Sequence, residues 1–459
     1  MTLIKSISGI RGTIGGKPQD NLTPLDIVKY ASSFGQWIIE TNSARKVVIG
    51  RDARISGEMV SNLITNTLIG MGIDVVDLGL STTPTVEIAV PKENAGGGIV
   101  ITASHNPVQW NALKLLNSLG EFLSAEDGKQ ILYLAEKAEF HYAEVFGLGA
   151  YSIADQYIDE HIEDILSLAL VDKTIIAKKG FKVAIDCVNS SGGIAIPKLL
   201  RALGVEVIEQ MYCEPNGHFP HNPEPLPEHL TEICKKIEGG EFDVGFVVDP
   251  DVDRLAIIDE NGVFIGEEYT LVLVSDYVLS QTPGDVVSNL SSSGALTKIA
   301  EKYNQKREEA AVGEVNVVTK MKSIGAIIGG EGNGGIIYPE LHYGRDSLVG
   351  IALFLTHLAK SGKSVSQLKL ECPQTYISKN KIELSHSINV DNMLEKLSKE
   401  FKTHPQNHID GIKIYFGDEW AHIRKSNTEP IIRIYSESTT KEKAENVFLK
   451  IKEIIDRII

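Results

Sequence analysis

The order strand, polar turn, helix, glycine and strand occurs three times in this chain, and this repetition limits the possible folds more than any other feature. The first copy has an apolar strand at 46–50, a helix at about 59–70 and a second strand at 73–78. The second copy begins at 181–186 and the third at 285–290, so their starts lie about 100 to 135 residues apart. This order is typical of βαβ units, and the intervals are too long for a solenoid repeat. The pattern predicts three similar α/β domains, each with a largely parallel sheet.

The C-terminal residues follow a different pattern. We expect a strand at 376–384, a helix at 390–401, strands at 411–416 and 431–435, and a final helix at 441–459 with Thr439 or Thr440 as its N-cap. This mixture predicts an α+β domain. For 459 residues, several domains are expected at about 150 residues each. The predicted domains are 1–150, 151–255, 256–368 and 369–459.

Composition excludes some classes of partner. The chain has 45 Lys and Arg against 61 Asp and Glu, a net charge of −16. Nucleic acids and anionic membranes require a basic face, so neither is an expected partner. The four cysteines form no CxxC pair, which excludes the usual zinc and disulfide patterns. The sequence shows neither a signal-peptide pattern nor a run of about 20 apolar residues, so we expect a cytoplasmic protein with reduced thiols.

The first candidate site is a serine at the end of a strand. An apolar strand at 97–101 leads into the polar segment 102–107, in which Asn106-Pro107 opens a turn. Ser104 is well placed there as a nucleophile or as the carrier of a transferred group. Neighbouring residues of an extended chain point in opposite directions, which disfavours His105 as a base for Ser104, and no G-x-S-x-G elbow is present. A turn serine that only caps a helix is the alternative.

The second candidate site is an acidic loop after the strand at 242–248. In an extended chain, residues i, i+2 and i+4 share one face, so three carboxylates converge: Asp249, Asp251 and Asp253. Oxygen ligands of this kind favour Mg²⁺, Mn²⁺ or Ca²⁺. Their spacing approaches that of an EF-hand, but Arg254 stands where the sharp turn requires glycine. A solvated loop without metal is the other alternative, and Arg254 either neutralises the carboxylates or faces an anionic substrate.

A glycine-rich loop follows the apolar strand at 326–328. It spans 329–335 and contains Glu331 and Asn333, whose side chains suit hydrogen bonds to hydroxyl groups. Glycines let the backbone approach a ligand closely, although a flexible turn explains the loop equally well. The sequence is not a Walker loop, because no Gly-Lys-Ser/Thr follows.

A basic loop lies between two predicted strands of the last domain. It spans 424–430 and is followed by Arg433. Guanidinium groups, hydroxyls and an amide suit a phosphate dianion, because charge-assisted and bidentate contacts are strong. A solvated hairpin tip is the alternative.

These four loops, in this order and one per domain, resemble the α-D-phosphohexomutase family of phosphoglucomutases, phosphomannomutases and phosphoglucosamine mutases. The resemblance covers essentially the whole chain, including Gly-Ile-Arg-Gly-Thr at 9–13. The segments 313–316, 331–335 and 342–346 are similar to the archaeal-type phosphoglucosamine mutase branch. The resemblance implies three similar α/β domains with mixed, largely parallel sheets and a C-terminal α+β domain around a central cleft. In chain order they would carry the phosphoserine, the metal, the sugar-recognition loop and a phosphate-binding loop.

The resemblance also implies roles for individual residues. Ser104 matches the phosphoserine, and one Mg²⁺ per site would be held by a Ser104 phosphate oxygen and by Asp249, Asp251 and Asp253. The sugar would be bound by Glu331 and Asn333, and its non-reacting phosphate by Arg424, Ser426, Asn427, Thr428 and Arg433. Lys114 matches a proposed acid/base lysine, so that the expected catalytic set is Ser104, Lys114, Arg11, His105 and Arg254.

The implied activity is the interconversion of hexose 6-phosphate and 1-phosphate through a phosphoserine and a hexose 1,6-bisphosphate, which serves as intermediate and activator. Glucosamine phosphate is the expected substrate. A dual phosphomannomutase/phosphoglucomutase, a phosphatase using the same phosphoserine and a non-catalytic phosphosugar-binding protein are the alternatives. The chain departs from the family at Ala112, where glycine is frequent, and at Gly335, where many members have histidine. Monomer and homodimer both stay open.

Overall fold

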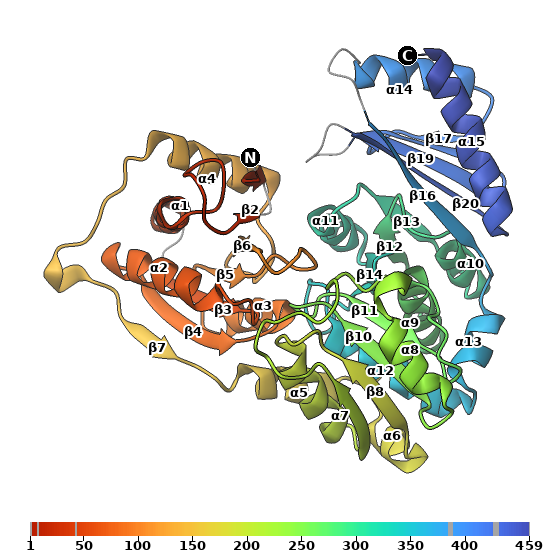
Figure 1. The fold of residues 1–459 in the computed structure, drawn as a ribbon, viewed down its shortest axis with the longest axis horizontal. Coiled ribbons are helices and arrows are strands. Elements are labelled where there is room, and N and C mark those ends of the chain that lie inside the picture. The colour runs from red at the N-terminus through yellow and green to blue at the C-terminus, as the bar shows by residue number, and fades with distance from the viewer. Residues whose placement is uncertain (1, 7–8, 42–43, 384–388, 426–430, 459) are drawn as a thin grey trace. The chain divides into compact units, whose positions relative to one another are not determined.

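The computed structural model describes residues 2–6, 9–41, 44–383, 389–425 and 431–458 (Figure 1). The chain divides into two compact units. The first unit comprises Met1–Thr270 and Asn333–Ser366, and the second comprises Leu271–Gly332 and Gln367–Ile459. None of the described helices is long and apolar enough to cross a membrane.

The first unit begins with a mixed seven-stranded sheet in the order β1-β2-β6-β5-β3-β4-β7. Its strands are β1 (Ile4–Ser6), β2 (Gly9–Thr13), β3 (Lys46–Arg51), β4 (Asp74–Leu80), β5 (Gly97–Ile101), β6 (Trp110–Leu116) and β7 (Tyr151–Ile153). β3 is parallel to β4 and β5, whereas β6 is antiparallel to β5 and β2. The predicted βαβ unit at 46–78 is therefore confirmed, and the antiparallel strands make the sheet mixed.

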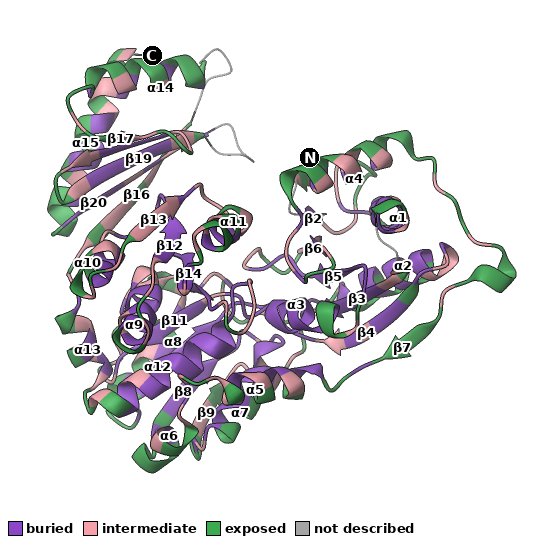
Figure 2. Cartoon of the chain, turned by 180° about the vertical axis from the view of Figure 1, so that it is seen from behind, coloured by how far each residue is buried: buried purple, intermediate pink, exposed green. Residues whose placement is uncertain are grey.

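Helices cover both faces of this sheet because its strands are apolar on both sides. They are α1 (Pro24–Thr41), α2 (Gly57–Gly70), α3 (Thr83–Lys92) and α4 (Ala125–Lys137). Val47 and Ile49 pack in one cluster with residues of α1, α2 and α4, while Val48 faces the residues of α3. Figure 2 shows β3 and β5 buried between these layers. The hydroxyl of Thr82 caps α3 by accepting a hydrogen bond from the backbone N–H of Thr85 at 3.1 Å.

A second sheet of the first unit has the order β11-β10-β8-β9. Its strands are β8 (Lys182–Asp186), β9 (Val207–Met211), β10 (Val244–Val248) and β11 (Leu255–Ile258). The helices of this region are α5 (Tyr157–Ser167), α6 (Lys173–Lys179), α7 (Gly192–Ala202) and α8 (Thr231–Glu238), with a short 3₁₀ turn at Pro227–His229. Another 3₁₀ turn, Val145–Gly147, precedes β7 of the first sheet. β8 is parallel to β9 and β10, as the second βαβ copy predicts. The later segment of the first unit, Asn333–Ser366, contains β15 (Gly335–Ile337), which is not part of this sheet, and α12 (Ser347–Ser361).

The second unit contains the third βαβ copy. Strand β12 (Val286–Asn289) lies between β13 (Arg307–Ala310) and β14 (Ile328–Glu331) and is parallel to both. The helices of this part are α10 (Ala295–Lys302) and α11 (Glu314–Ile324), and α9 (Glu267–Gln281) precedes them. β14 extends to Glu331, so part of the predicted glycine loop is strand.

The C-terminal part of the second unit is an antiparallel sheet in the order β16-β20-β19-β18-β17. Its strands are β16 (Tyr376–Glu383), β17 (Gln406–Asn407), β18 (Ile412–Phe416), β19 (Glu419–Lys425) and β20 (Ile431–Ser438), and its helices are α14 (Val390–Glu400) and α15 (Lys441–Ile458). Helix α13 (Val365–Glu371) precedes them. The predicted α+β character is confirmed, but β19 was not expected. Thr440 caps α15, because its Oγ1 accepts a hydrogen bond from the N–H of Lys443 at 3.2 Å.

Candidate active site

Ser104 follows the carboxyl end of β5, where its backbone takes a left-handed conformation with φ 48°. Its Oγ donates a hydrogen bond to Oδ2 of Asp249 over 2.8 Å. His105 Nδ1 lies 3.4 Å from the same Oγ. The expectation that His105 points away from Ser104 is therefore wrong, because it assumed an extended backbone at this position. The imidazole of His105 therefore lies beside the hydroxyl of Ser104.

The three aspartates converge after the carboxyl end of β10. Their carboxylate oxygens lie within 4.8 Å of one another. A turn causes this convergence: the N–H of Val252 donates to the carbonyl of Asp249 at 3.1 Å, and Val252 has φ 65°. The three side chains converge as predicted, but the backbone from Asp249 to Asp253 forms a turn and is not extended as assumed. A strand precedes the loop, so the EF-hand alternative is wrong.

The charges of this cluster suit a divalent cation. Burial, together with Asp253 and Asp251, raises the pKa of Asp249 well above its ordinary value. Burial also raises the pKa of Asp253, but Arg345, Lys114 and Arg254 together hold it below its ordinary value. Among the described residues, Oδ1 of Asp251 and Oδ1 of Asp253 are buried without a hydrogen-bond partner. Unpaired carboxylate oxygens at such a site are ligands that Mg²⁺ prefers, so these residues fit that ion.

Lys114 extends from β6 to these carboxylates. Its Nζ lies 2.6 Å from Oδ2 of Asp251 and 3.1 Å from Oδ2 of Asp253. Burial lowers the pKa of Lys114, but the two carboxylates outweigh this effect and raise it above its ordinary value. Ala112 lies within the same strand without a left-handed backbone, so alanine in place of the family's glycine causes no strain there.

Three further predicted residues lie near the serine and aspartate loops. Nη1 of Arg254 lies 3.5 Å from Oε1 of Glu224, and Nε2 of His105 lies 3.8 Å from the same oxygen. Burial and then Arg254 lower the pKa of His105 well below its ordinary value, so the imidazole is neutral at pH 7. Arg11 lies on β2 opposite Ala112, and burial followed by the charge of Arg254 lowers its pKa.

Two contacts of the acidic loop were missed from the sequence. Nη2 of Arg345 donates to Oδ2 of Asp253 at 2.7 Å, and the hydroxyl of Thr83 donates to Oδ2 of Asp251 at 2.5 Å. The neighbouring Asp346 caps α12 and has its Oδ2 2.9 Å from Nε2 of the buried His161. Arg345 and Asp346 lie in the segment 342–346, which resembles the archaeal-type branch. The sequence alone assigned neither residue a role.

The two predicted sugar-binding side chains belong to different units. In the second unit, Oε1 of Glu331 accepts hydrogen bonds from Nδ2 of Asn289 at 2.8 Å and from the N–H of Gly313 at 3.0 Å. In the first unit, Oδ1 of Asn333 accepts from the N–H of Gly335 at 3.3 Å. Gly334 has φ +86°, and a Cβ there would lie 2.3 Å from the carbonyl oxygen of Leu255. That glycine therefore permits a close approach of two backbones rather than of a ligand.

The predicted phosphate-binding loop is described only in part. Arg424 lies on β19 directly opposite Arg433 on β20. Ser426, Asn427 and Thr428 lie outside the described residues. Nε of Arg424 is buried and lacks a hydrogen-bond partner within the described part of the chain, and burial lowers the pKa of its guanidinium. Two adjacent guanidinium groups with one unused buried donor fit an anionic ligand.

Comparisons with known proteins agree with this architecture. The sequence matches four domain models in order: phosphoglucomutase/phosphomannomutase alpha/beta/alpha domain I at 3–142, domain II at 156–262, domain III at 266–376 and the C-terminal domain at 388–454. A "Phosphoglucomutase/phosphomannomutase" of Thermococcus kodakarensis is 37% identical over 94% of this chain and 95% of the relative. The chain therefore belongs to the phosphoglucomutase/phosphomannomutase family, whose members are phosphohexomutase enzymes.

Other relatives have a different substrate name. A "Phosphoglucosamine/phosphogalactosamine mutase" of Sulfurisphaera tokodaii is 31% identical over 98% of each chain. Both relatives are archaeal, in agreement with the resemblance to the archaeal-type branch. The crystal structure of a phosphoglucomutase/phosphomannomutase family protein from Burkholderia thailandensis has the same fold, with a TM-score of 0.86, 23% identity and coverage of 99% of this chain and 97% of that one.

Proposed function

We propose that this protein is a phosphohexomutase that interconverts the 6-phosphate and 1-phosphate of a hexose, with glucosamine phosphate as its preferred substrate. The observation that carries the proposal is the position of Ser104. Its Oγ lies 2.8 Å from one carboxylate of a buried acidic triad. A phosphoryl group on this oxygen would lie beside a site for a divalent cation, which is the arrangement that phosphoryl transfer requires.

The proposed reaction passes one phosphoryl group between Ser104 and the sugar. A sugar hydroxyl attacks phosphorus, the bond from phosphorus to Oγ of Ser104 breaks, and Oγ takes up a proton. The product of this half-reaction is a hexose 1,6-bisphosphate, and its other phosphate then returns a phosphoryl group to Ser104. The bisphosphate is thus both intermediate and activator.

The residues proposed to hold Mg²⁺ are Asp249, Asp251 and Asp253, together with a phosphate oxygen on Ser104. When bound, the ion supplies charge neutralisation at the transferring phosphoryl group. The chain's own cations supply further positive charge, and the proposed residues are Lys114, Arg11 and Arg254. Arg345 keeps Asp253 ionised and in place by donating to its Oδ2 at 2.7 Å.

The attacking hydroxyl has to lose a proton during the reaction. Lys114 is the first proposed group for acid/base exchange, in accordance with its position in the family pattern. It is a cation beside the aspartates, so its first proposed role is to donate a proton. The neutral His105, 3.4 Å from Oγ of Ser104, is the second proposed group and suits proton acceptance.

The proposed preference for glucosamine rests on acidic groups in the second unit. An amine at C2 is favoured by a nearby carboxylate. Glu331 accepts a hydrogen bond from the N–H of Gly313 at 3.0 Å, and the next residue is Glu314, which is also buried. The carboxylate of Glu331 therefore lies beside the backbone at the start of α11, where Glu314 is the first residue. The name of the Sulfurisphaera relative supports an amino sugar, whereas that of the Thermococcus relative supports the alternative, a dual phosphomannomutase/phosphoglucomutase.

The phosphate that does not react is proposed to bind Arg424 and Arg433, together with Ser426, Asn427 and Thr428. Asn333 completes the proposed sugar contacts. A cytoplasmic location and the absence of nucleic-acid and membrane partners stay predictions.

The test is kcat/KM for the 1-phosphates of glucosamine, glucose and mannose, with Mg²⁺ and a hexose 1,6-bisphosphate present. We expect a preference for glucosamine of about tenfold, equivalent to about 1.4 kcal/mol in transition-state binding. Glu331→Gln should remove that preference, whereas Glu308→Gln, at an ion pair with Lys320, should keep it. Equal rates for the three sugars contradict the glucosamine assignment, and release of free phosphate in place of an isomer contradicts the mutase.

A further inference from the structure

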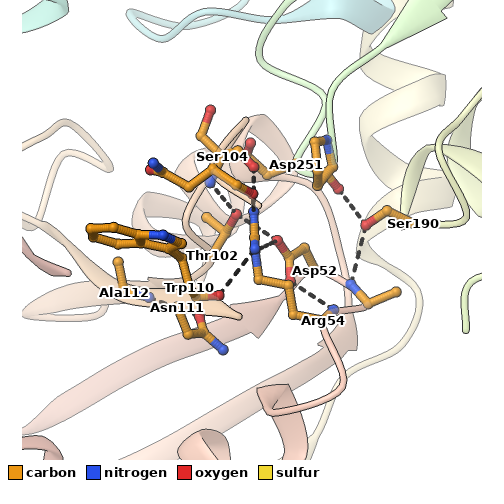
Figure 3. Close-up of polar contacts among 12 residues, drawn as sticks. Asp52, Arg54, Thr102, Ser104, Trp110, Asn111, Ala112, Ser190 and Asp251 are labelled. Atoms are coloured by element: carbon orange, nitrogen blue, oxygen red, sulfur yellow. Dashed lines mark hydrogen bonds and ion pairs between the residues drawn. The ribbon is translucent and has the colours of Figure 1, made fainter. Parts of the chain in front are cut away.

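Arg54 is the largest of the fully buried side chains that the structure describes, with 1% of its surface exposed. A guanidinium has five N–H donors in a fixed plane. Nε donates to Oδ2 of Asp52 at 3.0 Å, and the other four donors reach carbonyl oxygens of the segment from Ser104 to Trp110, the first residue of β6 (Figure 3). These carbonyls belong to Ser104 (2.5 Å), Asn106 (2.6 Å), Pro107 (2.7 Å) and Trp110 (3.0 Å). Arg54 therefore holds the whole loop that carries Ser104.

The carboxylate of Asp52 reaches the other side of the Ser104 backbone. It is fully buried, and its Oδ2 accepts a hydrogen bond from the hydroxyl of Thr102 at 2.7 Å. Oγ1 of Thr102 in turn accepts from the N–H of Ser104 at 2.9 Å. The N–H of Ser104 is thus held through Thr102, and its carbonyl through Arg54. Both routes end at the same carboxylate.

This network explains how Ser104 keeps an unfavourable backbone. Its φ of 48° is a left-handed conformation, which costs a residue with a side chain about 1 to 2 kcal/mol. The hydrogen bonds at its N–H and carbonyl fix the peptide planes on both sides. With the backbone fixed in this way, Oγ is aimed at Asp249 rather than into the sheet.

The same segment is also tied to the acidic loop. The N–H of Ala53, between Asp52 and Arg54, donates to Oγ of Ser190 at 3.2 Å. Oγ of Ser190 donates to the carbonyl of Pro250 at 2.7 Å. Pro250 lies between two of the proposed metal ligands. One short segment is therefore bonded directly to the loop that carries the serine and, through Ser190, to the loop that carries the aspartates (Figure 3).

We propose that Asp52 and Arg54 are positioning residues for phosphoryl transfer, which set the direction of Oγ of Ser104 relative to the acidic triad. The inference rests on the mutase function proposed above. In phosphoryl transfer, catalysis is mostly alignment and charge neutralisation. A displacement of about 1 Å lowers the rate by roughly 100-fold. Arg54 touches neither the sugar nor the phosphoryl group in this proposal, so its loss should change kcat and leave KM nearly unaffected.

The first test is Arg54→Lys, which keeps the charge but lacks the planar fork. We expect kcat to fall by about 100-fold with KM changed by less than about twofold. Hydrogen exchange at 102–110 should become faster, while exchange in the second unit stays as in the wild type. Lys198→Ala, at an exposed ion pair with Asp159, is the control and should match the wild type in kcat.

A second pair of variants keeps the test informative if Arg54→Lys does not fold. Thr102→Val removes the hydroxyl at constant volume, and Thr102→Ser keeps it. We expect a fall in kcat of about tenfold for valine, equivalent to one lost hydrogen bond, and less than about threefold for serine. An unchanged kcat in Arg54→Lys, a loss confined to KM, or equal effects of valine and serine would overturn the positioning role. A wild type without mutase activity contradicts the proposed function itself, and with it this role.

Discussion

Two arginines with buried side chains, one in each unit, hold loops at the carboxyl ends of strands, but their negative partners differ. Arg54 holds the Ser104 loop and pairs through Nε with Asp52 of its own segment at 3.0 Å. Arg307 holds the loop after β12, with Nε bonded to the hydroxyl of Ser288 at 2.7 Å and Glu309 only 3.6 Å from its Nη2. Its other acceptors are Thr297 Oγ1 and the carbonyls of Ser293, Asn289 and Ser292.

The two regions differ in the groups that the carboxylates of Asp52 and Glu309 contact. The side chain of Asp52 bonds to residues of its own region, because its partners are Arg54 and Thr102. Glu309 also accepts a hydrogen bond from Nζ of Lys413 at 2.6 Å and another from the hydroxyl of Tyr415, both on β18. The loop of Ser104 is therefore held by contacts within its own region, whereas the carboxylate near the loop beside Glu331 is shared with the C-terminal sheet. We infer that the first region sets chemistry and the second links sugar binding to the last domain.

The largest expected effect comes from the charge of the acidic triad. Asp251→Asn removes one carboxylate charge and leaves a side chain of the same shape. We expect kcat to fall by about 1,000-fold and Mn²⁺ binding, measured by electron paramagnetic resonance, to weaken strongly. The exposed Asp159→Asn is the matched control and should bind Mn²⁺ as the wild type does. Full activity in Asp251→Asn would show that the acidic triad is not needed for the chemistry that we assign to the Ser104 region.

A smaller effect is expected in the second unit. Arg307→Lys loosens the loop whose Asn289 donates to Glu331 at 2.8 Å. Because this loop supports the proposed sugar contact, we expect KM to rise by about tenfold while kcat changes by less than about threefold. Steady-state kinetics beside Arg54→Lys give the direct contrast. If both variants lose kcat alone, the two regions do not divide chemistry and binding.

The smallest effect concerns stability and pH. Burial and then Arg307 lower the pKa of Lys413 to about 8, despite the opposing carboxylates of Glu309 and Glu437. In the unfolded chain a lysine titrates near pH 10.4. Between these values the unfolded state binds more protons, so the stability of the folded state rises with pH, by about 1 kcal/mol per pH unit. The pKa of Tyr415 is raised, so its opposite effect begins above about pH 10.

Lys413→Met should remove this rise. Thermal unfolding of the wild type and the variant at pH 8 and pH 9.5 measures the rise in stability between these pH values, which should be present in the wild type and absent in the variant. Lys443→Met, on the exposed side of α15, is the control and should keep the wild-type dependence. If stability depends on pH in the same way in the wild type and in Lys413→Met, the pKa of Lys413 is not lowered in the folded protein.

Periodicity and turn residues allowed most of the fold to be predicted. The three βαβ copies and the final α+β part follow from apolar strands closed by glycine and polar turns. Strand β19 escaped this reasoning because Glu419, His422 and Arg424 interrupt its apolar pattern. In the structure it lies between β18 and β20, and pairing on both sides outweighs the weak local preference.

The candidate site was predictable where chemistry lies in the side chains themselves. Ser104 and the three aspartates were found because they end apolar strands. The backbone of these loops was not found, since left-handed residues such as Ser104 and Val252 carry no local signal. Asp52 and Arg54 were placed in a polar turn, where solvation is the ordinary expectation. Their burial depends on residues about 50 positions away in the sequence, such as Thr102 and Ser104, which periodicity does not show.

The proposed function depends most directly on Ser104, which we propose carries the transferred phosphoryl group. Wild type and Ser104→Ala are each incubated with Mg²⁺ and a hexose 1,6-bisphosphate and then examined by intact mass and peptide mapping. We expect one added phosphoryl group on Ser104 in the wild type and none in the variant. Both proteins should bind the phosphosugar, and only the wild type should turn it over. A phosphoryl group on another residue, or a Ser104→Ala variant that still interconverts the sugar phosphates, would contradict this proposal.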